Sequence, residues 1–166
     1  YFPREVLPIA TVTSAFVNMI LTFIVVFGVV IIAGRGIHIH AMLCLPIVMI
    51  VEYILCLGIA LIVSSITVYL RDLQYILGIF VMALQYLTPV MYGVDMVENS
   101  GAGYWLVFLF NLNPMTPIIR IYRQIIYYGE VPELHSLLLA LIVGIVFIVI
   151  GEVMFKKLQK GFAEEF

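Results

Sequence analysis

Charged side chains are scarce in this sequence. Asp, Glu, Lys and Arg make up 11% of its 166 residues, whereas 64% are hydrophobic. A soluble domain carries about 25% charged residues and needs polar side chains to cover its core. The composition therefore indicates a protein embedded in a lipid bilayer. Its eight basic residues do not form the clustered basic face that nucleic-acid binding requires, which excludes nucleic acid as a partner.

The sequence also lacks the motifs of nucleotide hydrolysis and of metal catalysis. A P-loop needs glycines followed by a lysine, but lysine occurs only at positions 156, 157 and 160, and none of the three follows a glycine. No histidine belongs to a His-Glu-x-x-His motif. His38 and His40 have no third ligand nearby and are predicted to be solvated loop residues. We therefore expect no catalytic centre, no cofactor and no metal site.

Cysteine is almost absent as well. Cys44 and Cys56 lie twelve positions apart on one predicted helix, about 18 Å along its axis. This separation excludes a disulfide between them. Both are predicted to be small apolar residues with a free thiol.

Long uncharged runs, in contrast, are abundant. A helix of about 20 apolar residues crosses the hydrocarbon core of a membrane, and backbone groups in lipid must be hydrogen-bonded within the segment. The predicted fold is therefore an all-α, multi-pass integral membrane domain with four transmembrane helices. These helices are expected at residues 12–32, 41–68, 73–94 and 136–155.

Residues 95–135, between the third and fourth runs, form a different kind of segment. Their apolar stretches, 104–110 and 118–128, are too short to cross. Asn113-Pro114 and Thr116-Pro117 are predicted to break the helix between them, because proline lacks a backbone donor and disfavours helix in the preceding residue. We predict a re-entrant helical hairpin that lines the transport path.

Basic residues that flank the runs predict the orientation. Cytoplasmic flanks are enriched in Lys and Arg, and only Arg35 lies in a short loop on the opposite side. Residues 1–11 and 156–166 are therefore predicted to be cytoplasmic, and the hairpin is predicted to lie on the outer side. The basic residues on the predicted cytoplasmic side are Arg4, Arg71, Lys156, Lys157 and Lys160.

Two acidic residues lie within predicted spans. A carboxyl group at the middle of a bilayer costs about 2.5 kcal/mol or more. Glu52 is therefore either a functional group that faces a cavity or a protonated carboxyl that bonds a neighbouring helix. Glu152 is expected to pair with Lys156 across one helical turn.

The second arm of the predicted hairpin is amphipathic. Its polar face offers guanidinium donors to an anionic or hydroxyl-rich substrate, or it pairs with Asp95, Glu130 or Glu133; both interpretations stay open. The polar face consists of Arg120, Arg123, Gln124 and Tyr127, and the opposite face consists of Ile118, Ile119, Tyr122 and Ile126.

Aromatic residues are concentrated towards the predicted outer side. They are typical of a membrane-interface belt, and they also suit the stacking of sugar rings on Tyr and Trp. Both interpretations stay open. The residues are Tyr86, Tyr92, Tyr104, Trp105, Phe108, Phe110, Tyr122, Tyr127 and Tyr128.

Five local strings, taken in order, resemble the permease subunits of ABC polysaccharide exporters. These subunits move lipid-linked O-antigen, capsule or teichoic acid chains. The strings cover nearly the whole chain and resemble the C-terminal portion of such a permease. They are YFPREVLP (1–8), YLRDLQY (69–75), YLTPVMY (86–92), LNPMTP (112–117) and FKKLQKGFAEE (155–165).

The resemblance implies a non-catalytic subunit in the cytoplasmic membrane of a bacterium. It implies a dimer of permeases, two separate ATPase subunits, and an N-terminal interface helix and two further crossings that are missing here. Arg4, Glu5, Arg71 and Asp72 are the expected contacts with the ATPase. The substrate path is expected to include Glu52, Tyr86, Tyr92, Trp105, Arg120, Arg123, Gln124 and Tyr127.

Two other functions remain open at this point. An ABC permease that exports drugs or lipids would favour a smoother apolar cavity. An ion-coupled secondary transporter would use Glu52 as its proton site. Dependence on ATP separates this second alternative from the two ABC transporters.

Overall fold

The computed structural model describes residues 5–32, 39–70, 72–88, 108 and 112–158, and in this part of the chain every regular element is a helix. The predicted all-α class is therefore confirmed for these residues. The elements are α1 (Val6–Ile32), α2 (Ile39–Met42), α3 (Leu45–Thr67), α4 (Leu73–Leu87), α7 (Met115–Arg123), the π-helix η1 (Gln124–Tyr128) and α8 (Leu134–Leu158).

Three helical segments are long and apolar enough to cross a membrane. They are α1, the stretch His40–Thr67 and α8, with 27, 28 and 25 residues. They coincide with the first, second and fourth predicted crossings. Helix α1 begins earlier than predicted, at Val6, so it includes residues 6–11, which we predicted to be cytoplasmic.

The second crossing is interrupted near its start by a proline. Helix α2 ends at Met42, and α3 begins at Leu45 with Pro46 in its first turn. A proline ring clashes with the carbonyl four residues earlier, which here belongs to Met42. The chain therefore makes a turn between α2 and α3, in which the Cys44 N–H donates to the Ala41 carbonyl at 3.0 Å.

The third predicted crossing is not confirmed. Helix α4 has 15 residues, or roughly 22 Å, which is shorter than a hydrocarbon core of about 30 Å. It ends because Thr88 is extended, with ψ 129°, as expected for a residue before a proline. Residues 89–94, which we predicted to complete this crossing, lie outside the described part of the chain.

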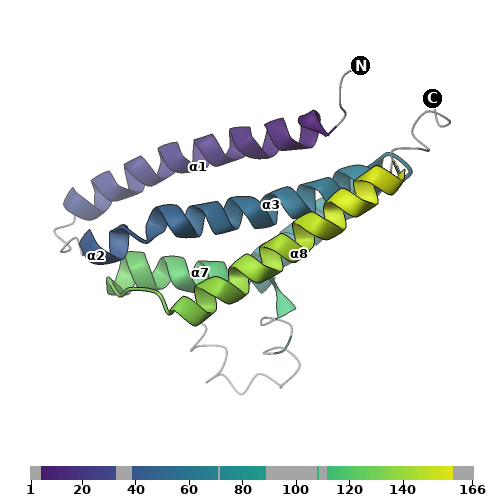
Figure 1. Ribbon diagram of the computed structural model, residues 1–166. Coiled ribbons are helices and arrows are strands. Elements are labelled where there is room, and N and C mark those ends of the chain that lie inside the picture. Colours follow the sequence, from purple (N-terminus) through teal and green to yellow (C-terminus); the bar gives the residue numbers. More distant parts are fainter. Residues whose placement is uncertain (1–4, 33–38, 71, 89–107, 109–111, 159–166) are drawn as a thin grey trace.

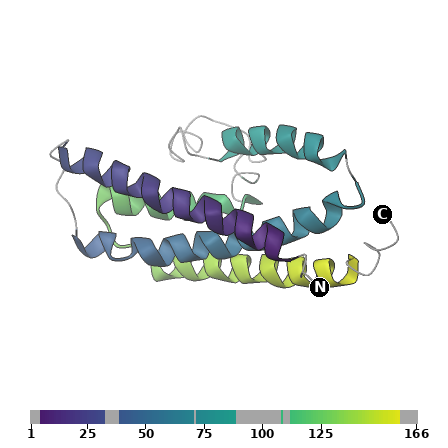
Figure 2. The ribbon, with the colours of Figure 1, turned by 90° about the horizontal axis from the view of Figure 1, so that it is seen from above.

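Helix α3 lies at the centre of the arrangement. Helix α8 runs beside it in the same direction, α7 lies beside one half of it, and α1 runs antiparallel to it on another side (Figures 1 and 2). Helix α4 stands apart from the other helices (Figure 2). The start of α1 and the ends of α3 and α8 lie at one end of the molecule (Figure 1).

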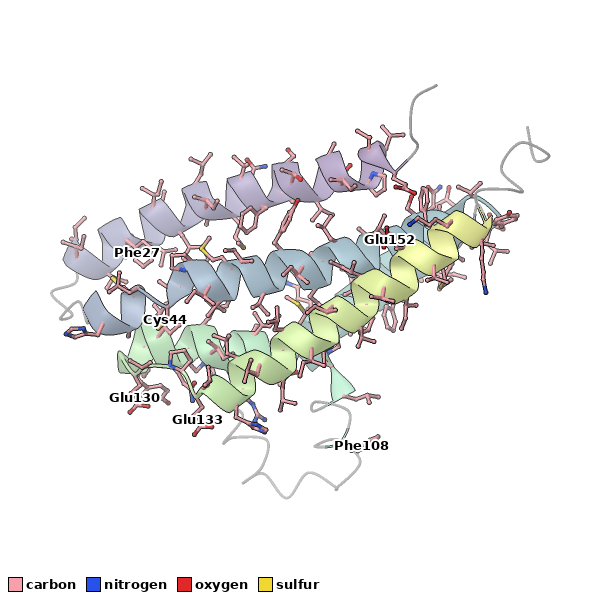
Figure 3. All side chains as sticks on the ribbon, viewed as in Figure 1. Phe27, Cys44, Phe108, Glu130, Glu133 and Glu152 are labelled. Atoms are coloured by element: carbon pink, nitrogen blue, oxygen red, sulfur yellow. The ribbon has the colours of Figure 1, made fainter. Side chains whose placement is uncertain are left out.

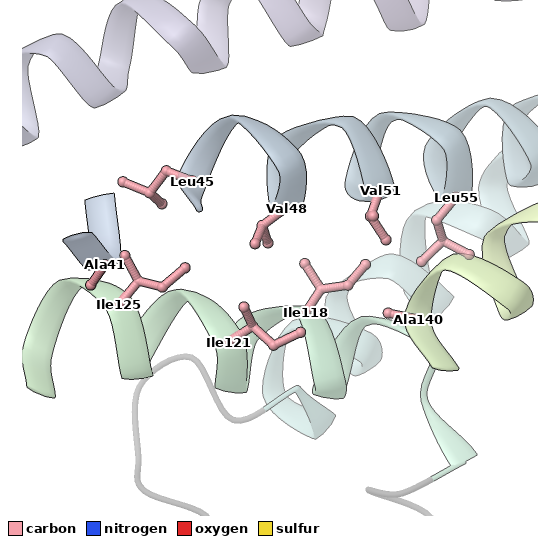
Figure 4. Packing of buried hydrophobic residues seen from close by; sticks show 9 residues of the cluster. All are labelled: Ala41, Leu45, Val48, Val51, Leu55, Ile118, Ile121, Ile125 and Ala140. Atoms are coloured by element: carbon pink, nitrogen blue, oxygen red, sulfur yellow. The ribbon is translucent and has the colours of Figure 1, made fainter. Parts of the chain in front are cut away.

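The hydrophobic core lies between α3, α7 and the start of α8. Ile118 and Ile121 of α7 and Ile125 of η1 form one cluster with a stripe of α3 whose members are spaced three or four residues apart (Figure 4). That spacing places them on one face of α3. The core residues are Ala41, Leu45, Val48, Val51, Leu55, Ile118, Ile121, Ile125 and Ala140.

Glycine allows α3 and α8 to pack closely. A Cβ added to Gly58 would lie 2.6 Å from the backbone nitrogen of Ile148 and 2.6 Å from the carbonyl carbon of Phe147. A Cβ added to Gly151 would lie 2.8 Å from the Gly58 carbonyl oxygen. Small residues permit such backbone contact between membrane helices. These glycines therefore set the distance between α3 and α8.

Orientation in the membrane is open to a direct test. Glu130 lies at the end of the molecule where α8 begins, and Glu152 lies near the opposite end, where α1 begins and α8 ends (Figure 3). We expect a single cysteine at Glu130 to react with an impermeant thiol reagent added outside intact cells. A cysteine at Lys157, which is exposed near the other end, should react only after the cells are opened. The reverse pattern would show that the predicted orientation is inverted.

Candidate functional site

Helix α7 begins three residues before the predicted stretch 118–128. It starts at Met115 after Pro114, so the predicted break at Asn113-Pro114 agrees with the structure. The predicted break at Thr116-Pro117 is wrong, because both residues lie in the first turn of α7. A proline is tolerated there since the first helical N–H groups have no partner within the helix.

Asn113 joins this helix start to the end of α4. Its side-chain oxygen accepts the Met115 N–H at 3.0 Å, and its side-chain nitrogen donates to the Thr88 hydroxyl at 2.8 Å. Asn113 and Thr88 are both buried. Residues 88 and 113 are therefore fixed to each other, although 25 positions separate them.

The buried face of α7 differs in part from the predicted one. Ile118, Ile121 and Ile125 are buried against the core. Ile118 was predicted to lie on the apolar face. The other predicted members, Ile119, Tyr122 and Ile126, are half-buried. The reason is that α7 packs against both α3 and α8, so the face that is buried most deeply lies between the two.

The C-terminal end of this segment is a π-helix. Residues 124–128 form η1, and Gly129 ends it with φ 68°, a left-handed conformation that favours glycine. The Glu130 N–H then donates to the Gln124 carbonyl at 3.1 Å. Short π-helical segments are frequent at functional sites.

A cavity of about 540 Å³ lies between α7 and the first half of α8. This volume is typical of small-molecule sites. Polar side chains from both helices and their flanking loops line it, together with apolar residues of α8. The polar residues are Asn113, Thr116, Arg120, Gln124, Glu133 and Ser136, and the apolar residues include Ile121, Leu139, Val143 and Phe147.

The lining combines two kinds of chemistry. Arg120 supplies guanidinium donors, while the amides and hydroxyls both donate and accept hydrogen bonds. The apolar side chains of the wall can pack against the C–H groups of a ligand. Such a lining fits a ligand with hydroxyl groups and apolar faces, and the guanidinium group also suits an anion. Glu133 lines the same cavity, so both charge signs are present.

Glu52 does not line this cavity. The Tyr122 hydroxyl donates a hydrogen bond of 2.6 Å to its carboxyl oxygen Oε2, and both side chains are half-buried. The Tyr122 ring also stacks on Phe23 of α1, with ring centroids 5.4 Å apart. This geometry agrees with the interpretation of Glu52 as a carboxyl that bonds a neighbouring helix.

The remaining predicted path residues are dispersed. Arg123 and Tyr127 share the predicted polar face of α7 with Arg120 and Gln124, but they are not among the residues that line the cavity. Tyr86 of α4 is 79% exposed. Tyr92 and Trp105 lie outside the described residues.

The predicted ATPase contacts are only partly described. Arg4 and Arg71 lie outside the described residues, Glu5 is half-buried and Asp72 is exposed. The loop that carries Asp72 is attached to the end of α8, because the Tyr69 hydroxyl donates to the Leu158 carbonyl at 2.7 Å. The predicted pair of Lys156 and Glu152 is present, with the ammonium nitrogen 2.9 Å from Oε1.

The long apolar helices and the mixed polar cavity define a multi-pass membrane protein with a candidate solute site. The ABC-2 type transporter family model matches residues 1–127. The chain therefore belongs to the ABC-2 type transporter family, in agreement with the resemblance found in its sequence.

Relatives with curated names match nearly the whole chain. An O-antigen export system permease protein RfbA of Klebsiella pneumoniae is 26% identical over 163 residues, or 98% of this chain and 61% of the relative. An RfbA of Myxococcus xanthus is 26% identical over the same shares. This chain thus spans about three fifths of the length of these relatives.

Sequence reasoning missed two features of the site. Ser136, in the first turn of α8, lines the cavity together with α7, but it lies in a run that was interpreted only as a crossing. Glu133, just before α8, also lines the cavity, although it was considered only as a pairing partner of the polar face. Tyr122 was assigned to the apolar face, and its partner Glu52 lies 70 positions away. A hydrogen bond between such distant residues leaves no periodic signal in the sequence.

Proposed function

We propose that this chain is the permease region of an ATP-driven exporter that moves a lipid-linked polysaccharide across the cytoplasmic membrane of a bacterium. The observation that carries this proposal is the cavity between α7 and α8. Its amide, hydroxyl and guanidinium groups suit the hydroxyls of a sugar, and its apolar wall suits the C–H faces of the ring. Membership of the ABC-2 type transporter family and the names of the relatives support the same function.

Within this proposal Arg120 and Gln124 contact the passing chain. Both residues line the cavity; Arg120 belongs to α7, and Gln124 follows one helical turn later as the first residue of η1. Arg123, Tyr127 and Tyr86 contribute to the same path at its edge, and Tyr92 and Trp105 belong to it by sequence alone. Glu52 supports this path from the opposite side of α7 and has no direct contact with the substrate.

We propose that the energy for transport comes from a separate subunit. ABC-2 permeases work with an ATPase subunit, and we propose that the permease acts as a homodimer with two such ATPases. Arg4, Glu5, Arg71 and Asp72 form the contact on the cytoplasmic side. The bond between Tyr69 and Leu158 supports this assignment, because a displacement of the loop would reach α8 directly.

The proposed function is tested with the full-length permease and its ATPase in proteoliposomes. We expect lipid-linked polysaccharide supplied on the ATP side to reach the opposite leaflet only when ATP is hydrolysed. The measurement is the fraction of glycan that an added glycosidase or lectin detects in intact vesicles, with a non-hydrolysable nucleotide as the control. ATP-driven movement of a drug or a plain phospholipid, without the glycan, would identify the alternative ABC exporter. Movement driven by a proton gradient without ATP would identify a secondary transporter.

A further inference from the structure

We infer that Glu52 is a positioning residue: through Tyr122 it fixes the rotation of α7 that turns Arg120 towards the cavity. The inference rests on the proposed function of that cavity. It assigns Glu52 a role different from substrate contact and from proton transfer, and it gives Tyr122 a function that the sequence did not indicate.

Tyr122 and Arg120 occupy different sides of α7. Tyr122 follows Arg120 by two residues, which corresponds to roughly 200° around an α-helix. The two side chains therefore leave α7 on nearly opposite sides. Arg120 lines the cavity beside α8, whereas Tyr122 contacts Glu52 of α3 and Phe23 of α1. Any rotation of α7 that breaks one contact displaces the other.

The apolar contacts of α7 do not by themselves determine its rotation about the helix axis. Ile118 and Ile121, with Ile125 of the adjoining η1, hold α7 against α3 by burial, and the hydrophobic effect is not directional. Similar burial is available to a helix that has turned slightly, because Ile119 and Ile126 are half-buried on its flanks. A hydrogen bond depends on the angle at its hydrogen. The Tyr122 bond thus selects one rotation among several that bury a similar area.

The contacts of Tyr122 link three helices at one point. Glu52 belongs to α3, Tyr122 to α7 and Phe23 to α1, and the Tyr122 ring contacts the other two residues at once. Helix α1 has no buried residue of its own, so such side-chain contacts determine how it meets the rest of the molecule. A displacement of α1 therefore reaches the helix that carries Arg120.

The experiment uses the full-length permease with its ATPase and compares Tyr122→Phe, Glu52→Met and Glu52→Gln. Tyr53→Phe is the matched control, since the Tyr53 hydroxyl also bonds another helix, at 2.8 Å from the Thr13 hydroxyl on α1, and its ring packs on Phe16 of the same helix. Each variant is measured twice. The first readout is glycan exported per ATP hydrolysed. The second is the rate at which a cysteine at position 124 reacts with an impermeant reagent after Cys44 and Cys56 are replaced by alanine.

We expect Tyr122→Phe and Glu52→Met each to lower export per ATP by about tenfold, the effect of one hydrogen bond. Both should also change the reaction rate of the cysteine at position 124. Glu52→Gln should keep both readouts within about twofold of the parent, because an amide oxygen still accepts the Tyr122 hydrogen bond. Combining Tyr122→Phe with Glu52→Met should cost no more than either change alone.

Three outcomes would overturn the inference. A Glu52→Gln variant as impaired as Glu52→Met would show that the ionisable group itself is needed. Reaction rates of the cysteine in Tyr122→Phe and Glu52→Met equal to that of the parent would show that α7 keeps its rotation without the bond. Equal loss in Tyr53→Phe would show a general effect on helix packing. If the parent moves no glycan, the proposed function fails, and the reaction rates alone then decide the role of Glu52.

Discussion

Replacement of Gly58 by leucine is expected to prevent α3 and α8 from packing and to remove most folded permease from the membrane. Even a single added Cβ would lie 2.6 Å from backbone atoms of Phe147 and Ile148, and backbone cannot turn aside as a side chain can. Overpacking a core typically costs 1–3 kcal/mol. Because the contact here is with backbone, we expect a loss of at least about 3 kcal/mol. The measurement is the yield and thermal stability of monodisperse protein by gel filtration after detergent extraction.

Other glycines of the same chain provide graded controls. Gly28 in α1 and Gly78 in α4 have no atoms within 4 Å of an added Cβ, so leucine at either position should leave yield and stability nearly unchanged. Gly144→Ala should have a small effect, because its nearest neighbour is a side-chain carbon of Ile54 at 3.1 Å. Gly151→Ala should resemble a change at Gly58. A Gly58→Leu protein that is as stable as the parent would contradict the close approach of α3 and α8.

The same glycines show the limit of hydropathy as a guide to this fold. The crossings at residues 12–32, 41–68 and 136–155 were predictable, because a long uncharged run has few alternatives in a membrane protein. Their packing was not predictable in the same way. Gly58 and Gly151 meet across two helices that are far apart in sequence, and a run of apolar residues carries no information on which of its faces meets which neighbour.

The predicted breaks depended on proline and were only partly right. Pro114 precedes α7 and Pro46 lies in the first turn of α3, where a missing N–H has little consequence. Pro117 lies in the first turn of α7 for the same reason, although it was interpreted as a break. Proline is compatible with the first turn of a helix and disrupts the interior of one, and the sequence alone did not distinguish the two.

The candidate site was recognised in part because its polar residues follow a helical period. Arg120 and Gln124 were predicted from their spacing, and both line the cavity. Arg123 and Tyr127 satisfy the same spacing but are not among its lining residues. The difference arises because α8 covers only one flank of α7, and which flank it covers is decided by contacts from distant parts of the chain.

Substitutions of the two arginines of α7 are therefore expected to lower export by very different amounts. Arg120→Gln is expected to lower ATP-driven export at least about tenfold, because it removes a charge-assisted donor from the cavity. Arg123→Gln should cost about twofold or less, since Arg123 does not line the cavity. Glutamine keeps hydrogen-bonding capacity and similar length, so the comparison tests the guanidinium charge. Export per ATP in proteoliposomes is the measurement, and yield and thermal stability are the controls for folding. The variant Arg120→Lys reports whether charge alone is sufficient.

Equal losses at positions 120 and 123 would show that the whole polar face of α7 acts on the substrate. Parental export by Arg120→Gln with normal yield would place the path of the glycan outside the cavity between α7 and α8.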